Sequence, residues 1–222
     1  INGLSLDIAP GELRCIIGPN GAGKTTMMDI ITGKTKPDSG QVFFGSTIDL
    51  LRHNEPEIAQ LGIGRKFQKP TVFEHLSVFE NLVTAACFGA QVAEKEAWAI
   101  AWDVLQQTGL ARFANQPAGG LTLLNRKRLE LARALATRPR LLLLDEIAGG
   151  LTEHEAHELV DELKRIKQAG MTMIWIEHVV HALLSIADRL HVINFGKTLC
   201  VGEPQAVMQD AEVRRVYMGL EA

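Results

Sequence analysis

Short apolar runs alternate with longer amphipathic segments along much of the chain, and this alternation predicts the order of its elements. Runs bounded by glycine or polar residues predict strands at 13–17, 41–44, 141–144, 171–176 and 190–195. Helices are expected at 23–32, 153–168 and from the end of the 171–176 strand to about residue 187. The run at 141–144 is four consecutive leucines, which is typical of a strand covered on both faces. The pattern therefore predicts an α/β fold with a mostly parallel sheet.

The middle of the chain lacks this alternation. From about residue 78 to 108 the apolar residues recur at helical spacing, and a second helix is expected from 122 to about 137. Trp98 and Trp102 are four positions apart and so share one helix face, which favours a packed helical lobe over a cofactor role. We therefore expect one domain over residues 1–222, with a helical lobe inserted at approximately 70–138.

Composition and charge narrow the classes of protein to consider. The 222 residues are 46% hydrophobic and 22% charged, as in ordinary globular proteins. The formal net charge of -3 argues against a broad basic face for nucleic acid. No run approaches the roughly 18 apolar residues of a membrane span, and no secretion signal is visible. We therefore expect any work at a membrane to go through a partner protein.

A candidate phosphate-binding loop follows the first predicted strand and precedes the first predicted helix. Residues 18–25, GPNGAGKT, match the pattern GxxxxGK[ST] at every position. Glycines let backbone N–H groups face phosphate oxygens, and the positive end of a helix favours anions. Lys24 is expected to reach the β- and γ-phosphates, and the Thr25 hydroxyl to bind Mg2+. The predicted nucleotide-binding residues of this loop are Gly18, Pro19, Asn20, Gly21, Ala22, Gly23, Lys24, Thr25 and Thr26.

Two carboxylates follow the predicted strand at 141–144. Open parallel sheets bind ligands at the carboxyl ends of their strands, which is where Asp145 and Glu146 fall. Asp145 suits the outer coordination shell of Mg2+, and Glu146 is placed to orient or deprotonate an attacking water. An exposed acidic pair often simply ends a strand, but here it accompanies a complete phosphate loop.

Two further polar residues follow apolar segments at places where such a site needs them. The amide of Gln68, at the start of the predicted lobe, can meet Mg2+ or the water and relay nucleotide state to a partner. His178 follows the predicted strand at 171–176, where its imidazole can donate to the γ-phosphate and hold the water. The predicted catalytic residues are Glu146, His178 and Gln68. The predicted Mg2+ ligands are Thr25, Gln68 and Asp145.

With these motifs in this order, the chain resembles the nucleotide-binding subunit of an ABC transporter, in the group that serves branched-chain amino acids, urea and short amides. The resemblance covers essentially the whole chain. The stretch GRKFQKPTVFEHLSVFENL is similar to the urea branch. In contrast, LTLLNRKRLELARALATRPRLLLLDEIAGGL with WIEHVVHAL looks more like the branched-chain amino acid branch. The cargo is therefore open between the two.

This resemblance implies a P-loop NTPase fold, in which a RecA-like core with a mostly parallel sheet has an antiparallel β part and the inserted helical lobe. It implies an ATPase that uses ATP and Mg2+ and pairs head to tail with a second ABC ATPase subunit, identical or a paralogue. It further implies two integral membrane permease subunits, a periplasmic or extracellular substrate-binding protein, no nucleic acid, and a cytoplasmic location at the inner face of the membrane. The alternatives are a soluble ABC ATPase acting on nucleic acid or ribosomes, and the ATPase of a lipid or lipopolysaccharide exporter.

The chain departs from the family at the signature LSGGQ, whose place is taken by LTLLN at residues 121–125. In the family this segment touches the γ-phosphate held by the other subunit. Thr122 keeps a hydroxyl that can cap the following helix, so it joins the predicted nucleotide-binding residues. Leu124 is expected to place a bulky side chain where close backbone approach is needed. We therefore predict that this subunit contributes a weaker half of a composite site, which a partner with a better signature would compensate.

Overall fold

The computed structural model describes residues 1–66 and 72–218, and within these ranges it contains one six-stranded and one two-stranded sheet. The large sheet has the order β4-β5-β6-β1-β7-β8, with β8 antiparallel to β7 and the other pairs parallel. The strands are β1 Leu13–Ile17, β2 Phe43–Phe44, β3 Ile48–Asp49, β4 Ile63–Lys66, β5 Leu141–Asp145, β6 Thr172–Ile176, β7 Arg189–Asn194 and β8 Lys197–Gly202. The predicted α/β fold, a mostly parallel sheet with an antiparallel part, is confirmed.

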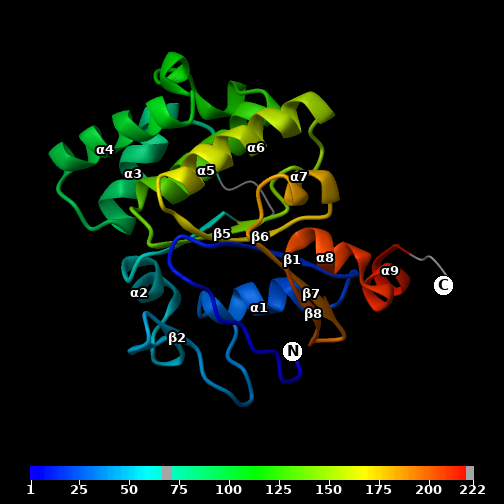
Figure 1. The fold of residues 1–222 in the computed structure, drawn as a ribbon. Coiled ribbons are helices and arrows are strands. Elements are labelled where there is room, and N and C mark those ends of the chain that lie inside the picture. The colour runs from blue at the N-terminus through cyan, green and yellow to red at the C-terminus, as the bar shows by residue number, and fades with distance from the viewer. Residues whose placement is uncertain (67–71, 219–222) are drawn as a thin grey trace.

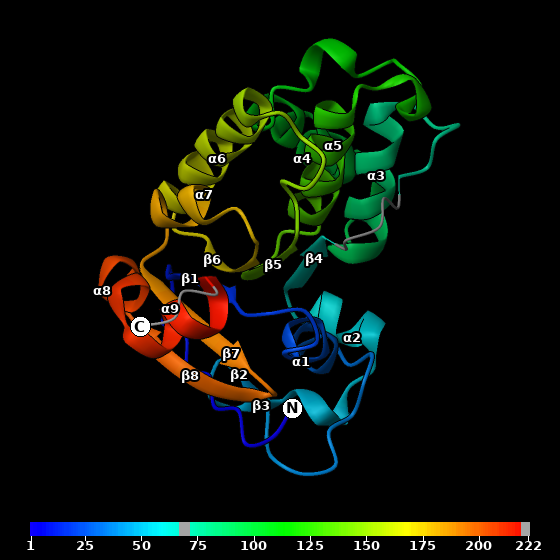
Figure 2. The same ribbon diagram turned by 90° about the vertical axis from the view of Figure 1, so that its right-hand side faces the viewer.

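Helices cover both faces of the large sheet (Figures 1 and 2). They are α1 Lys24–Ile31, α2 Glu55–Gln60, α3 Val78–Gly89, α4 Glu94–Gln107, α5 Leu123–Ala136, α6 Glu153–Gln168, α7 Val180–Leu184, α8 Pro204–Gln209 and α9 Ala211–Met218. Helices α3 to α6 lie on one side of the sheet, and α1 with α2 on the other. Because side chains alternate along a strand, Cys15 and Ile17 of β1 face the first side, whereas Ile16 packs with Met28 of α1. The parallel strands therefore bring their carboxyl ends to one edge of a buried sheet.

Helices α3, α4 and α5 pack together at one end of the molecule (Figure 1), where the helical lobe is expected. The segment predicted as one helix at 78–108 is two, because the chain turns after Gly89 and Gln91 adopts a left-handed φ of 53°. Trp98 and Trp102 are 54% and 46% exposed, so the two tryptophans do not form the packed interior of this layer. The division of the chain into a core and a lobe at approximately 70–138 stays a prediction.

Strand β4 was not predicted, because two of its four residues are charged. The side chains of Arg65 and Lys66 are 5% and 1% exposed, and each is paired, Arg65 with Asp29 and Asp145 and Lys66 with Glu130. Burial of paired charges gives no hydrophobic pattern, although the strand lies in the interior. Over the same described ranges, no helix is long and apolar enough to span a membrane.

Candidate active site

The predicted phosphate loop joins β1 to α1 and depends on its glycines. A Cβ added to Gly18 would lie 2.1 Å from the backbone oxygen of Ile193 in β7, so only glycine fits there. Gly23, the N-cap of α1, has a φ of 104°, a left-handed conformation that favours glycine. Thr25 and Thr26 are exposed in the first turn of the helix. The loop therefore turns from a buried strand straight into a helix N-terminus, whose backbone N–H groups attract phosphate.

Lys24 folds back over this loop. Its Nζ donates to the carbonyl oxygens of Gly18 at 2.7 Å and Pro19 at 3.0 Å, and only 7% of the residue is exposed. Burial lowers the pKa of Lys24, and the negative charges of Glu146 and Asp145 oppose this shift. The structure thus brings the loop lysine within electrostatic reach of both predicted carboxylates.

Asp145 ends β5 and is 2% exposed. Its Oδ2 accepts a hydrogen bond from Arg65 Nη2 at 3.4 Å, whereas its Oδ1 is buried and makes no hydrogen bond to any described residue. Burial raises the pKa of Asp145, and the neighbouring Arg65 opposes this shift. Mg2+ prefers hard oxygen ligands. Two such oxygens are present here, the Oδ1 of Asp145, which has no donor among the described residues, and the hydroxyl of the exposed Thr25. The residues present therefore fit Mg2+.

Glu146 and His178 come from the ends of adjacent strands, and their side chains meet. The N–H of Glu146 donates to the carbonyl oxygen of Ile176 at 2.9 Å, which continues the pairing of β5 with β6. His178 Nε2 then lies 3.0 Å from Glu146 Oε1. Glu146 has a φ of 47°, and such backbone strain is concentrated at functional sites. The two predicted catalytic side chains therefore form a hydrogen-bonded pair at the carboxyl edge of the sheet.

Glu177 is a residue of this region whose role the sequence analysis missed. It is 2% exposed, its Oε2 accepts from the N–H of Ala148 at 2.9 Å, and its Oε1 accepts from the N–H of His178 at 2.9 Å. One buried carboxylate therefore ties the loop after Glu146 to the loop that carries His178. The available signal was an acidic residue directly after an apolar strand and beside another candidate.

Two predicted site residues remain, Gln68 and Thr122. Gln68 is outside the described residues, so its role stays a prediction. Thr122 is the N-cap of α5, where its Oγ1 accepts from the N–H of Asn125 at 3.4 Å, as predicted. Leu124 is 7% exposed and packs in the core, whereas Leu123 is 45% exposed. The expectation for Leu124 is therefore wrong, because the helix turns it inward and leaves Leu123 at the surface.

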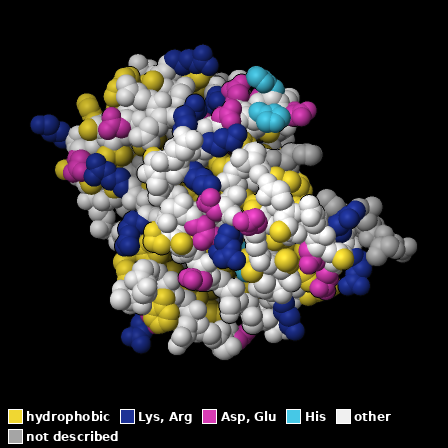
Figure 3. Space-filling model, viewed as in Figure 1, with side chains coloured by type: hydrophobic (Ala, Val, Ile, Leu, Met, Phe, Trp, Pro, Cys, Tyr) yellow, Lys and Arg dark blue, Asp and Glu magenta, His cyan; other side chains and the backbone are white. Residues whose placement is uncertain are grey.

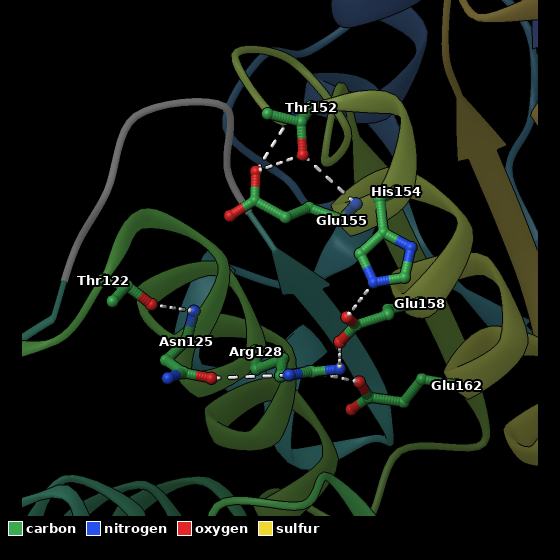
Figure 4. Close-up of polar contacts among 8 residues, drawn as sticks. All are labelled: Thr122, Asn125, Arg128, Thr152, His154, Glu155, Glu158 and Glu162. Atoms are coloured by element: carbon green, nitrogen blue, oxygen red, sulfur yellow. Dashed lines mark hydrogen bonds and ion pairs between the residues drawn. The ribbon is translucent and has the colours of Figure 1, made fainter.

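Polar contacts fix α5 against α6 (Figure 4). Arg128 of α5 donates from Nη2 to Glu158 at 2.8 Å and from Nε to Glu162 at 3.1 Å, both on α6. Its Nη1 also donates to Asn125 Oδ1 at 3.4 Å. Burial raises the pKa of Glu162 to about 7, although Arg128 opposes this shift. The first turn of α5 is thus tied to the helix that follows the loop of Glu146.

Comparison with known proteins identifies the family. A family model described as ABC transporter matches residues 1–149, a range that includes the phosphate loop and the acidic pair. The chain belongs to the ABC transporter family. It is an ABC ATPase subunit, and its P-loop and acidic pair are parts of an ATP-binding cassette.

Two curated relatives show the range of transport functions in this family. The chain is 34% identical over 240 residues to the high-affinity branched-chain amino acid transport ATP-binding protein LivG of Escherichia coli (strain K12), covering 99% of this chain and 91% of LivG. It is 30% identical over 221 residues to the lipopolysaccharide export system ATP-binding protein LptB of Haemophilus influenzae, covering 99% of this chain and 90% of LptB. One relative is named for branched-chain amino acid transport and the other for lipopolysaccharide export, so the family alone does not fix the cargo.

Solved structures agree with the fold. The ADP conformation of MJ1267, an ATP-binding cassette of an ABC transporter, superimposes with a TM-score of 0.86 at 29% identity and covers 98% of this chain and 91% of its own. The dimeric post-hydrolysis state of the cassette MJ0796, bound to ADP and Pi, gives a TM-score of 0.79 at 26% identity, covering 90% of this chain and 89% of that one. The P-loop NTPase fold of this ABC ATPase is therefore shown.

Proposed function

We propose that this ABC ATPase drives an importer for hydrophobic branched-chain amino acids or for urea and short amides. The identity to LivG over nearly the whole chain supports import of an amino acid class. The hydrolytic role is supported by the 3.0 Å contact of His178 with Glu146. This contact lies at the strand ends where the negative charges of Glu146 and Asp145 favour the charged form of Lys24. The subunit would work at the inner face of the membrane, with two permease subunits and an external substrate-binding protein.

Binding of the triphosphate follows from the loop. Lys24 would exchange its bonds to two loop carbonyl oxygens for bonds to phosphate oxygens, which carry full negative charge. Thr25 and Asp145, with Gln68, would hold Mg2+, which supplies positive charge against the phosphate oxygens. The exposed Thr26 lies one residue further along the same helix turn, where its backbone and hydroxyl can meet phosphate.

Hydrolysis follows from the paired side chains. Glu146 would orient the attacking water and accept its proton as the bond to the γ-phosphorus forms, while the bond from that phosphorus to the bridging oxygen breaks and ADP leaves; this role is worth about 10²–10⁴ in rate. His178, held beside Glu146, would keep the water in line and donate to the γ-phosphate. Glu177 would hold the loop after Glu146 next to the loop that carries His178, through its bonds to the N–H groups of Ala148 and His178.

A groove beside the helical layer is where we propose that a permease docks. It has a volume of about 410 Å3 and is lined by residues of α2, β4, α3 and α5. Phe88 is 78% and Phe73 45% exposed at its wall, and Arg133 stacks on the ring of Phe73 at 4.6 Å. Lys66, the last described residue before Gln68, also lines it. A permease segment in this groove would therefore contact β4 two residues before Gln68 in the sequence, the predicted sensor of the nucleotide.

Two other functions remain as alternatives to import. Figure 3 shows Lys and Arg side chains interspersed with Asp and Glu on one face, rather than gathered into one basic surface. This distribution gives no support to a nucleic-acid partner on that face. The identity to LptB supports the exporter alternative, which has the same cassette chemistry and a different cargo.

Affinity purification from the native membrane, joined to uptake measurements, tests the transport proposal. We expect the tagged chain to recover two integral membrane proteins, and cells lacking the chain to lose uptake of labelled leucine or of labelled urea. The variant Phe88→Ser, changed at an exposed side chain of the groove, should keep its isolated ATPase activity and lose the permeases. Recovery of nucleic acid, or of a lipopolysaccharide-binding partner with normal uptake of both solutes, would contradict the importer.

A further inference from the structure

Arg65 joins the phosphate-loop helix to the acidic strand end, and it belongs to none of the residues discussed above as binding or catalytic. Its Nη1 donates to Asp29 Oδ1 at 2.6 Å and to Thr32 Oγ1 at 3.1 Å, both on or next to α1. Its Nη2 donates to Asp145 Oδ2 at 3.4 Å. We propose that Arg65 is a positioning residue that holds Asp145 in the orientation needed to meet the Mg2+ of the bound nucleotide. This inference rests on the proposed ATPase mechanism.

The position of Arg65 in the sheet explains these contacts. Arg65 of β4 pairs with Leu143 of β5, and Asp145 follows two residues later on the same face, because side chains alternate along a strand. Leu143 belongs to the core on the α1 side of the sheet, so this face points toward α1. A side chain that leaves β4 on this face therefore reaches the helix and the carboxylate together.

The guanidinium contact also decides which oxygen of Asp145 is available. Arg65 takes Oδ2, and the buried Oδ1 has no hydrogen-bond donor in the part of the chain that the structure describes. Because Arg65 binds Oδ2, rotation of the Asp145 carboxylate is restricted, and the orientation of Oδ1 is restricted with it. Partners of this kind that orient a ligand or its carboxylate commonly change metal affinity by about 10- to 100-fold when removed.

An arginine suits this task better than a lysine. Its planar fork presents several donors in fixed directions, and here two of its nitrogens reach two carboxylates on different elements. A lysine ammonium is a compact charge that can neutralise one carboxylate but does not hold two at a set spacing. The variant Arg65→Lys therefore keeps the charge and removes the bridge.

The simplest alternative is that Arg65 only stabilises the fold. Buried ion pairs often add little net stability, yet removing one partner is strongly destabilising. Stability alone therefore does not separate the two roles, and the test needs a readout of metal dependence. Arg14 offers a matched control: it is 3% exposed and paired with Glu12 near the start of β1, whereas the phosphate loop follows the other end of that strand.

The experiment titrates Mn2+ by electron paramagnetic resonance into wild type, Arg65→Lys and Arg14→Lys, each with saturating ATP, and measures ATP binding in EDTA by calorimetry. We expect Arg65→Lys to raise the Mn2+ concentration at half-saturation about 10-fold or more, with the affinity for ATP in EDTA unchanged. Arg14→Lys should lower Tm without moving the Mn2+ curve. Asp29→Asn removes the charge at the other end of the Arg65 bridge. It should also raise the Mn2+ concentration at half-saturation, by a smaller factor.

The outcomes separate this inference from the proposed function. A folded Arg65→Lys variant with wild-type Mn2+ half-saturation would overturn the positioning role and leave the ATPase mechanism intact. If Arg65→Lys does not fold, Asp29→Asn decides, and an unchanged Mn2+ curve in that variant overturns the role. Absence of any ATP binding by the wild-type protein would instead overturn the proposed function itself.

Discussion

The strand ends and the start of α5 differ in how completely they supply the parts of an ATP-hydrolysing site. At the ends of β1, β5 and β6 the chain places Lys24 near the carboxylates of Asp145 and Glu146, and His178 in contact with Glu146. At the start of α5 it keeps the capping Thr122 and presents leucines where the family signature has glycines. The two regions therefore predict different things: full chemistry for the nucleotide held by this subunit, and weaker support for a nucleotide held by its partner.

The difference lies in the surface of α5 rather than in its placement. Thr122 still caps the helix, and Arg128 still ties it to Glu158 and Glu162 of α6 (Figure 4). Leu124 is absorbed into the core, so Leu123 is the changed side chain at the surface of this turn. Leu123 is therefore the side chain of this turn whose removal tests the effect of the changed signature.

Replacing Glu146 is expected to have the largest effect. The Glu146→Gln variant keeps the shape of the side chain but cannot accept the proton of the water, so phosphate release should fall by about 10²–10⁴-fold. Nucleotide binding should persist, and an ATP-bound dimer should accumulate in size-exclusion chromatography. The control is Glu153→Gln, an exposed residue at the start of α6. Hydrolysis by Glu146→Gln near the wild-type rate would remove Glu146 from its proposed role.

Replacing His178 is expected to have an intermediate effect. Loss of a hydrogen bond to a charged group costs about 1.5–3 kcal/mol, so His178→Ala should lower kcat by roughly 10- to 10²-fold. ATP affinity should change little, because the phosphate loop is untouched. His154→Ala, on the exposed start of α6, serves as the control in the same phosphate-release assay. An equal loss of rate in both variants would mean that the effect comes from stability and not from the pairing with Glu146.

Replacing Leu123 is expected to have the smallest effect and the opposite sign. Leu123→Gly removes the exposed side chain at the first position of α5, and turnover should rise roughly two- to tenfold, equivalent to about 0.4–1.4 kcal/mol. Leu124→Ala should instead destabilise the fold by about 2–5 kcal/mol, because that side chain is buried. Thermal unfolding and ATPase assays on the two variants give the comparison. No gain in turnover for Leu123→Gly would show that α5 is not the weak region.

The residues of the ATP-hydrolysing site could be predicted from the sequence more fully than the residues that position them. The phosphate loop and the acidic pair have fixed spacing and flanking elements, so Lys24 and Glu146 could be predicted from their order alone. Arg65 and Glu177 could not, because charged residues buried by pairing leave no apolar period and their partners are distant in sequence. The inward turn of Leu124 depends on where α5 begins, and helix starts shift by one or two residues without structural information.

The proposed binding of a triphosphate by the loop around Lys24 is tested by calorimetric titration of the wild-type protein and of Lys24→Ala with MgATP. We expect saturable binding by the wild type, and a loss of at least about 10-fold in affinity for Lys24→Ala, since the lysine supplies a charge-assisted bond to phosphate. A folded wild-type protein that takes up no nucleotide, or a Lys24→Ala variant that binds as tightly as wild type, would contradict it.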